Sequence, residues 1–246
     1  MSTGIWAAVS GATGQMAALD VAANNVANAG TPGFRADREV FAVALAGAMD
    51  GNGAESLRYN TLRSVQPDLS VGQIVHTGRE LDVALTREEG LFVVRTADGD
   101  RYTRAGKLVV ATDGTVTTPD GHTYVGTDRK PLRVAPGASH VAVNAAGALV
   151  VDGSETNARL LVVRFQNPAG LEKEGHVLLR AGAEAGRPEA IEPSLQVGAL
   201  ELSNASAVSG MTALVTVSRQ FEMLSRVIDA FAQADRRAAT DIMGSK

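Results

Sequence analysis

The chain has 246 residues, a net charge of −4, 45% hydrophobic residues and no cysteine. This length allows one sizeable core with appendages, and the lack of cysteine excludes disulfides, zinc–thiolate sites and thiol nucleophiles. The mild net charge argues against a general nucleic-acid or membrane surface.

Neither a membrane-spanning segment nor a secretory leader is visible in the sequence. No window reaches the roughly 20 continuous apolar residues that are needed to cross a bilayer. The first residues lack a basic region, and the stretch from Ile5 to Ala18 is interrupted by Ser10, Gly11 and Gln15. We therefore expect no membrane insertion, and any export should use a route without a cleaved signal peptide.

The first long apolar pattern follows a coiled-coil repeat. From Ile5 to Val26, apolar or small residues recur in alternating steps of four and three, the period of a helical seam. We expect this helix to end near Asn28 to Gly30, because Asn and Gly tolerate left-handed geometry and Pro32 blocks continuation. Its large seam residues, expected to pack on a partner helix, are Ile5, Val9, Met16 and Leu19.

The C-terminal segment repeats this pattern from Leu214 to Ile242. Its one polar seam residue, Asp235, either fixes the register or marks a fraying helix end. A seam is narrower than the stripe of a helix on a globular core, so two such segments favour helix-on-helix packing. The large seam residues here are Leu214, Val217, Phe221, Leu224, Ile228 and Phe231.

Between the helical segments the pattern changes to short strands. Residues 36–75 are rich in small residues, including Gly51-Asn52-Gly53, and are expected to be a connector. From Leu81, turn signals such as Asp98-Gly99 recur at the spacing of an antiparallel β domain. The last strand is expected at 177–179, before a stretch that leads into the C-terminal helix. Earlier strands are expected at 91–94, 107–110, 115–118, 141–143, 149–151 and 160–165.

This order of elements predicts an α+β fold in which terminal α-helices form a coiled-coil-like, antiparallel pair around an inserted antiparallel all-β domain. Residues 1–35 and 191–246 are expected to be the two helices of an assembly domain, 36–75 the connector and 76–190 the β-rich middle domain. Because both seams are rich in small residues, isolated helices should be marginal. Docking on neighbouring subunits would supply the missing burial.

A search for catalytic or ligand-binding patterns finds none. There is no nucleophile elbow, and Gly106-Lys107 lacks the upstream glycine of a phosphate-binding loop. The histidines are scattered without ligand spacing. We therefore expect no catalytic residues, no cofactor and no metal site. The histidines are His76, His122, His140 and His176.

One group of motifs resembles a known family. Asn24-Asn25-Val26-Ala27-Asn28 followed by Thr31-Pro32-Gly33-Phe34 resembles the N-terminal signature of bacterial flagellar basal-body rod proteins. Further matches to this family follow in its order at residues 77–84, 102–106, 198–201 and 219–223. The residues expected to set the helix exit and the next assembly contacts are Asn24, Asn25, Asn28, Thr31, Pro32, Gly33 and Phe34.

The resemblance implies a structural role. Rod proteins stack helically into the axle that crosses the periplasm and transmits torque to the hook. They leave the cell through the flagellar type III export apparatus without a cleaved signal, and their terminal helices form the inner tube with the β domain outside. The implied partners are other rod proteins, further copies of this chain and the export apparatus, with no nucleic acid.

Two alternatives remain open. The length and the run 219–223 favour a proximal-rod member over the distal-rod and hook-type axial relatives. From another functional class, the chain is alternatively a secreted ligand-binding β module that its helices merely dimerise. An enzyme is the weakest hypothesis, because no nucleophile, acid–base pair or metal cluster can be named.

Overall fold

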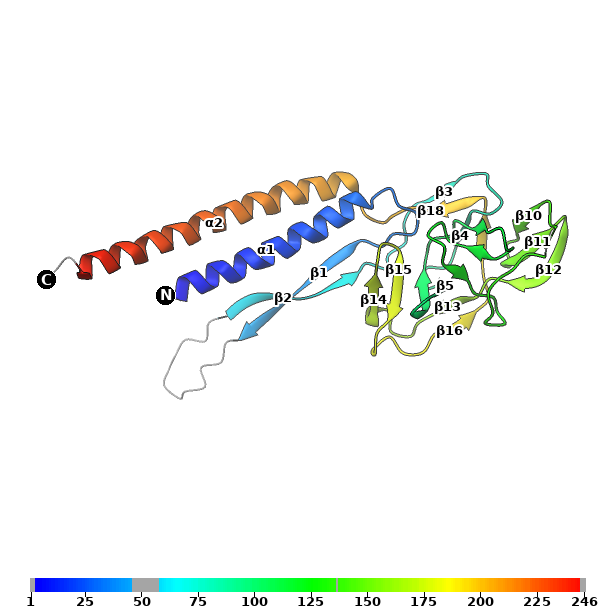
Figure 1. Cartoon of the computed structure of the whole chain (residues 1–246), viewed down its shortest axis with the longest axis horizontal. Coiled ribbons are helices and arrows are strands. Elements are labelled where there is room, and N and C mark those ends of the chain that lie inside the picture. Colours follow the sequence, from blue (N-terminus) through cyan, green and yellow to red (C-terminus); the bar gives the residue numbers. More distant parts are fainter. Residues whose placement is uncertain (1–2, 46–57, 136, 244–246) are drawn as a thin grey trace. The chain divides into compact units, whose positions relative to one another are not determined.

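The computed structural model describes residues 3–45, 58–135 and 137–243 of an α+β chain (Figure 1). These residues divide into two compact units. The helical unit comprises the described residues within Met1–Val26, Asp37–Val65 and Ala207–Lys246, and the β unit comprises those within Ala27–Ala36 and Gln66–Ser206.

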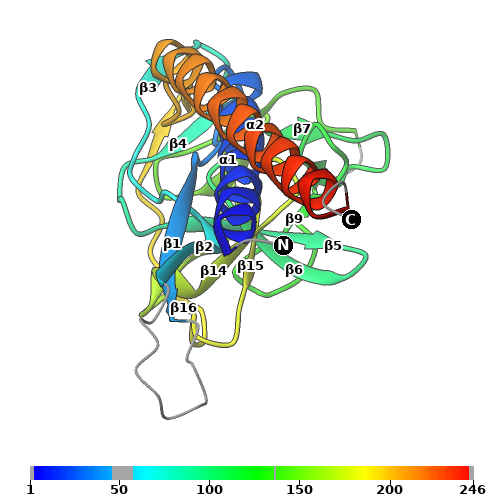
Figure 2. The ribbon, with the colours of Figure 1, turned by 90° about the vertical axis from the view of Figure 1, so that its left-hand side faces the viewer.

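Two long helices dominate the helical unit. Helix α1 covers Thr3–Ala27 and α2 covers Ala207–Met243. They run side by side (Figures 1 and 2). A Cβ added at Gly11 would lie 3.5 Å from Leu224 Cδ1, and one added at Gly210 would collide with the Val26 side chain. Gly11, in the first half of α1, therefore lies beside Leu224 in the middle of α2, and Val26 at the end of α1 lies beside Gly210 at the start of α2. The two helices are thus antiparallel. The end of α1 agrees with the prediction.

The helical unit also contains a two-stranded sheet of β1 (Asp37–Leu45) and β2 (Arg58–Pro67). Both strands lie inside the range 36–75, where the composition suggested a connector, so the structure differs from that prediction. Their sequences contain β-branched and aromatic residues such as Val40, Phe41 and Tyr59, which favour strands. The small residues around Gly51-Asn52-Gly53, which lie outside the described residues, concealed this preference.

The β unit is built on one nine-stranded, antiparallel sheet. Strand β5 lies at its centre, with β6 along one edge and both β13 and β9 along the other. The strands of this sheet are β5 (Leu91–Thr96), β6 (Gly99–Thr103), β7 (Val109–Val110), β8 (Val116–Thr117), β9 (Thr123–Tyr124), β13 (Val162–Arg164), β14 (Leu171–Glu174), β15 (Leu178–Ala181) and β16 (Glu189–Ile191).

Three smaller sheets complete the unit. One joins β10 (Val141–Val143), β11 (Ala148–Val151) and β12 (Ser154–Arg159). The others pair β3 (Ile74–His76) with β18 (Ala199–Glu201), and β4 (Val83–Leu85) with β17 (Leu195–Val197). A 3₁₀ turn, η1, covers Pro168–Gly170.

Strand β5 separates two hydrophobic cores, because successive side chains of a strand point to opposite faces. Phe92 and Val94 join the first core, and Leu91 and Val93 join the second. In the first core, Phe92 meets Tyr124 edge to face, and the Tyr124 hydroxyl donates to the Ala105 carbonyl at 2.8 Å. Full burial raises the pKa of Tyr124, so its hydroxyl stays a hydrogen-bond donor.

The expected turns lie between strands as predicted, but several short strands were missed. The missed strand β12 has the polar sequence Ser154–Arg159, and its side chains alternate between exposed and half-buried. Three-residue strands are too short to display an alternating pattern. This applies to β16, β17 and β18, which follow the last expected strand at 177–179. Residues 191–206, which we expected to belong with the C-terminal helix, instead contain β17 and β18. The helix itself begins at Ala207.

Candidate assembly surface

Among the side chains that the structure describes in helix α1, the buried ones are small rather than large. Of its predicted seam residues, Ile5 and Leu19 are half-buried, whereas Val9 and Met16 are 38% and 55% exposed. The face of α1 that the chain covers is thus not the predicted seam. One column of seam residues, which contains Val9 and Met16, is exposed in the described chain. The buried residues among those described in α1 are Ala8, Ala12, Ala18 and Ala22.

Helix α2 turns its predicted seam toward α1 without burying it fully. Leu224 packs near Gly11, and Leu214 lies with Leu19 along a shared groove. Leu214, Val217, Phe221, Leu224 and Ile228 are half-buried, and Phe231 is exposed. No side chain that the structure describes in α2 is buried.

A second set of apolar side chains on α2 is exposed. Large apolar side chains that gather on a surface mark contacts with other chains. The groove between the helices, of about 500 Å³, adds a concave surface lined by Leu19, Leu214, Val215, Ser218, Arg219 and Glu222. The exposed set consists of Val208, Met211, Val215, Met223 and Val227.

Two asparagines at the end of α1 hold the start of β1 within the helical unit. The Asp37 N–H donates to Asn25 Oδ1 at 2.7 Å, and Asn25 Nδ2 donates to the Asp37 carbonyl at 2.9 Å. Asn24 Nδ2 donates to Asp37 Oδ2 at 2.6 Å. The Asn25 amide thus bonds to both backbone groups of Asp37, as a neighbouring strand would. Both asparagines thus link the end of α1 to the first residue of β1.

The segment after α1 is anchored on the β unit. Thr31 N donates to the Asn28 carbonyl at 3.1 Å, and Phe34 N donates to the Thr31 carbonyl at 3.2 Å. Gly33 has φ +75°, and a Cβ there would collide with the backbone of Ala105. Phe34 is fully buried, with Lys173 Nζ 3.7 Å from its ring centroid.

These predicted site residues therefore divide into two groups. Gly33 and Phe34 are buried within the chain. Thr31 and Pro32 are half-buried and Asn28 is buried. Only the half-buried members retain surface that another subunit can reach.

A buried ionic cluster lies beside this segment and was assigned no role from the sequence. Glu201 is 1% exposed and accepts from Arg35 Nη2 at 2.5 Å and from Arg104 at 2.7–2.8 Å. The Gly72 N–H donates to the same carboxylate at 2.9 Å. Burial lowers the pKa of Arg104, and the charge of Glu201 partly offsets that effect. The cluster ties four distant chain segments together.

Asn204 forms a second tie nearby. Its Oδ1 accepts from the Ala36 N–H at 2.7 Å, and its Nδ2 donates to the carbonyls of Asp68 and Ser70 at 2.8 and 3.0 Å. The Asp68 N–H also donates to the Ala36 carbonyl at 2.7 Å. The chain passes between the units after residues 26, 36, 65 and 206. Asn204 therefore joins segments that adjoin three of these four crossings.

A signal for the ionic cluster existed in the sequence. Arg104 and Glu201 lie inside the motifs quoted above, and Glu201 stands between the apolar residues Leu200 and Leu202. A charged residue in such a run is rarely buried without a partner. That reasoning predicts a partner but cannot name it, because Glu201 and Arg35 are 166 residues apart.

The described residues contain no group of three or more His, Cys, Asp or Glu side chains placed to hold a metal ion. Within those residues, neither helix combines the length and apolar character needed to cross a membrane.

Comparisons with known proteins agree with the motifs. Residues 5–35 match the family model "Flagella basal body rod protein", and 196–241 match "Flagellar basal body rod FlgEFG protein C-terminal". Residues 87–151 match "Flagellar hook protein FlgE/F/G D1 domain". The three matches lie in the two helical ends and the β unit.

Full-length relatives extend this likeness over nearly the whole chain. The chain is 34% identical to the flagellar basal-body rod protein FlgF of Salmonella typhimurium, covering 97% of each chain. It is 32% identical to FlgF of Escherichia coli, covering 94% of each. It is 28% identical to the rod protein FlgG of Bacillus subtilis, covering 93% of this chain and 94% of that one. The identity to both FlgF chains exceeds that to this FlgG chain, and the protein belongs to the flagellar basal-body rod protein family.

Proposed function

We propose that this chain is a structural, non-enzymatic subunit of the flagellar basal-body rod. The observation that carries the proposal is the difference in packing between the two units. The β unit contains two hydrophobic cores, whereas the paired helices leave Val9, Met16 and Met211 exposed. A chain whose helices expose so much apolar surface is suited to association with other subunits.

The terminal helices are the proposed polymerisation surface. The antiparallel contacts at Gly11 and Gly210 support a coiled-coil-like pair. We infer that the seam residues named above contact neighbouring subunits through the sides that α1 and α2 do not cover. A head-to-tail contact that does not close on itself propagates as a helical tube. We place the chain in the proximal rod, which its length and the run 219–223 favour. The two FlgF relatives reported above are also more similar to the chain than the FlgG relative.

The remaining expectations follow from this proposal. The helices and the two-stranded sheet of β1 and β2 form the assembly domain, and the β unit forms the outer domain. Other rod proteins and further copies of this chain are the partners. Export uses the flagellar type III apparatus without a cleaved signal peptide. The ligand-binding module is not proposed, because each relative reported above carries the name of a rod protein.

The test is recovery of the chain from isolated hook–basal bodies. A strain that lacks the gene is complemented with the wild-type chain, and peptides from detergent-extracted hook–basal bodies are quantified by mass spectrometry. We expect a fixed ratio of this chain to the other rod components, with motility restored. Intact, functional basal bodies without the chain would contradict the proposal.

A further inference from the structure

Helix α2 carries a further seam, separate from the one that faces α1. Its residues recur in alternating steps of four and three, the period of a helix that packs on another helix. All of them are exposed, and the two largest apolar side chains, Met223 and Val227, are 58% and 42% exposed. We name this set the outer seam, which consists of Thr216, Gln220, Met223, Val227, Ala230 and Ala234.

The outer seam, the groove and the contact with α1 lie on three different sides of α2. Successive residues of an α-helix point about 100° apart. Of three consecutive residues, Glu222 lines the groove, Met223 belongs to the outer seam and Leu224 faces α1. The outer seam of one copy therefore cannot enter the groove of the same copy, and only another chain can bring these two surfaces together.

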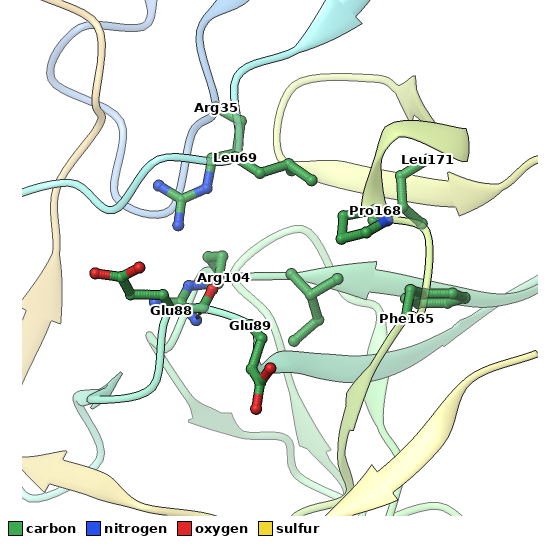
Figure 3. Close-up of a pocket in the computed structure, with 9 residues that line it drawn as sticks. Arg35, Leu69, Glu88, Glu89, Arg104, Phe165, Pro168 and Leu171 are labelled. Carbon is green, nitrogen blue, oxygen red and sulfur yellow. Dashed lines mark hydrogen bonds between the residues drawn. The ribbon is translucent and has the colours of Figure 1, made fainter. Parts of the chain in front are cut away.

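The groove has the size and the lining to receive side chains of a helix. Its volume is about 500 Å³, Leu19 and Leu214 supply apolar surface, and the exposed Met16 lies one turn from Leu19. The pocket of the β unit that Figure 3 shows is much smaller, at about 70 Å³. That volume holds only a few water molecules at about 30 Å³ each. Of these two concave surfaces, the groove is the one that fits a helix.

The charges beside the outer seam and beside the groove are opposite. Asp20, the one charged residue of α1, is exposed and follows Leu19 of the groove. Arg226 is exposed and borders the outer seam, three residues after Met223 and four before Ala230. None of the ion pairs that the described residues form includes Asp20 or Arg226. Both charges are thus open to a partner in another chain.

We propose that the outer seam of one copy packs into the groove of a second copy, with Arg226 of the first copy beside Asp20 of the second. Within one copy these charges cannot meet, because the contact of Gly11 with Leu224 places them about 16 Å apart along the helix axes. The contact is head-to-tail, so it can repeat from copy to copy. This inference rests on the proposed rod function and names a copy of this chain as the partner.

The first experiment traps the contact in the purified full-length chain. Because the chain has no cysteine, Met16→Cys and Val227→Cys together introduce its only two thiols. In one copy these positions are about 11 Å apart along the helix axes, which is beyond the reach of a disulfide. Under mild oxidation we expect a ladder of dimers, trimers and larger species on a denaturing gel. The disulfide accumulates with time, so a weak contact is recorded as well as a strong one.

The matched control combines Met16→Cys with Asn157→Cys, because Asn157 is exposed on β12 of the β unit. Random collisions cross-link both pairs of cysteines, whereas a specific contact favours the pair in the helices. We expect the control to give at least about fivefold less cross-linked product at the same protein concentration. Equal yields from the two pairs, or a seam pair that stays monomeric at the highest soluble concentration, would overturn the proposal.

The second experiment asks whether the partner is a copy of this chain. Asp20→Arg and Arg226→Glu, both at exposed positions, are expressed in a strain that lacks the gene. Each places like charges together at the contact, so we expect its amount in isolated basal bodies to fall at least about fivefold. A chain with both substitutions has opposite charges again at every contact between copies. Its amount should return to within about twofold of the wild type.

The outcomes separate this contact from the rod function. If the double variant is as scarce as the single ones, the two charges contact other proteins and the proposal is wrong. Normal incorporation of either single variant would also reject it. In both cases the wild-type chain is still recovered from basal bodies, so the rod function stands. Absence of the wild-type chain from basal bodies would reject the rod function, and the disulfide experiment on the purified chain would then decide on the contact alone.

Discussion

Single residues near the exit of α1 hold the β unit to a fixed geometry. Gly33 combines a left-handed backbone with direct contact to the Ala105 backbone, and Phe34 fills the space behind it. Glu201 then balances two buried guanidinium groups. These residues lie in or beside the family's motifs. Their packing explains in physical terms why the motifs contain these residue types.

We expect Gly33→Ala to destabilise the β unit through steric conflict. Alanine strains the left-handed backbone and also collides with Ala105, and neither backbone can easily shift. Gly78→Ala is the matched control, because Gly78 has φ +74° but nothing within 4 Å of the added Cβ. Urea denaturation should show a free energy of unfolding at least about 1–2 kcal/mol lower for Gly33→Ala than for Gly78→Ala. Equal losses would mean that only backbone strain matters.

Glu201→Gln should cost more than any surface ion pair. Without the carboxylate, the charges of Arg35 and Arg104 remain buried with no counter-ion. We expect the free energy of unfolding to fall by about 3–5 kcal/mol, as for other broken buried pairs. Glu172→Gln, which disrupts the exposed pair with Arg180, is the control and should leave stability unchanged within error. A similar, small effect of both substitutions would show that water already compensates the cluster.

At the scale of elements, the two helices use different parts of their seams. The Leu224 side of α2 faces α1 at Gly11, while Val9 and Met16 of α1 remain exposed. Substitutions in these two places should therefore have different effects. One set weakens the pair inside a subunit, and the other affects only contacts with additional chains.

Leu224→Asp places a charge where the two helices meet. We expect the β unit to stay folded, the helical signal of the free chain to fall and incorporation into the rod to be lost, because the charge must be desolvated. Circular dichroism of the purified chain and motility in soft agar measure the two effects. Leu224→Met, which keeps an apolar side chain of similar volume at the same position, should assemble normally. Normal motility of Leu224→Asp would falsify this prediction.

Met16→Glu should separate pairing from polymerisation. Met16 is 55% exposed on α1, so a glutamate there meets water in the free chain and should leave the circular dichroism spectrum unchanged. If this column contacts a neighbouring subunit, the buried charge would block incorporation into basal bodies. Asn24 and Asn25 do not belong to this column, so their hydrogen bonds to Asp37 stay intact in the variant. Wild-type incorporation of Met16→Glu would place the interface elsewhere on the helices.

The sequence predicted helices and turns better than strands. A helical seam of three heptads repeats often enough to be recognised, and a turn glycine such as Gly99 has a positive φ value that few other residues tolerate. In contrast, β16, β17 and β18 have three residues each. Their pairing is decided by distant partners such as β4, so no local pattern reveals them.

The candidate site was only partly predictable for the same reason. Periodicity located the helical seams but did not distinguish the covered side from the exposed side. The choice depends on small residues, since Ala12 and Gly11 allow close approach while Met16 does not. The partnership of Arg35 with Glu201 was invisible, because it forms only when the chain has closed a long loop.

At the scale of the whole molecule, the chain combines a well-packed β unit with weakly buried helices. The β unit has two cores centred on β5. Helix α2 has 37 residues and, among its described side chains, no buried one. Such a chain should not unfold as one cooperative block.

Hydrogen exchange of the free chain should reveal this difference. We expect backbone amides of α2 to exchange at least about 100-fold faster than those of β5, because few tertiary contacts hold the helix closed. In isolated basal bodies, α2 should become as protected as β5, since neighbouring subunits then cover it. Mass spectrometry of deuterated peptides measures both states. Equal protection of α2 and β5 in the free chain would show that the helices are stable without assembly.

The Asn204 tie has a consequence for how such a chain can change over generations. Ala36, Asp68 and Asn204 are joined by hydrogen bonds, so the segment 66–206 begins and ends close to itself and to residue 36. An insert whose ends meet can change in length at its loops without moving the chain on either side. The loops of 66–206 can thus diversify, provided that the partners of Gly33, Phe34 and Arg35 are kept.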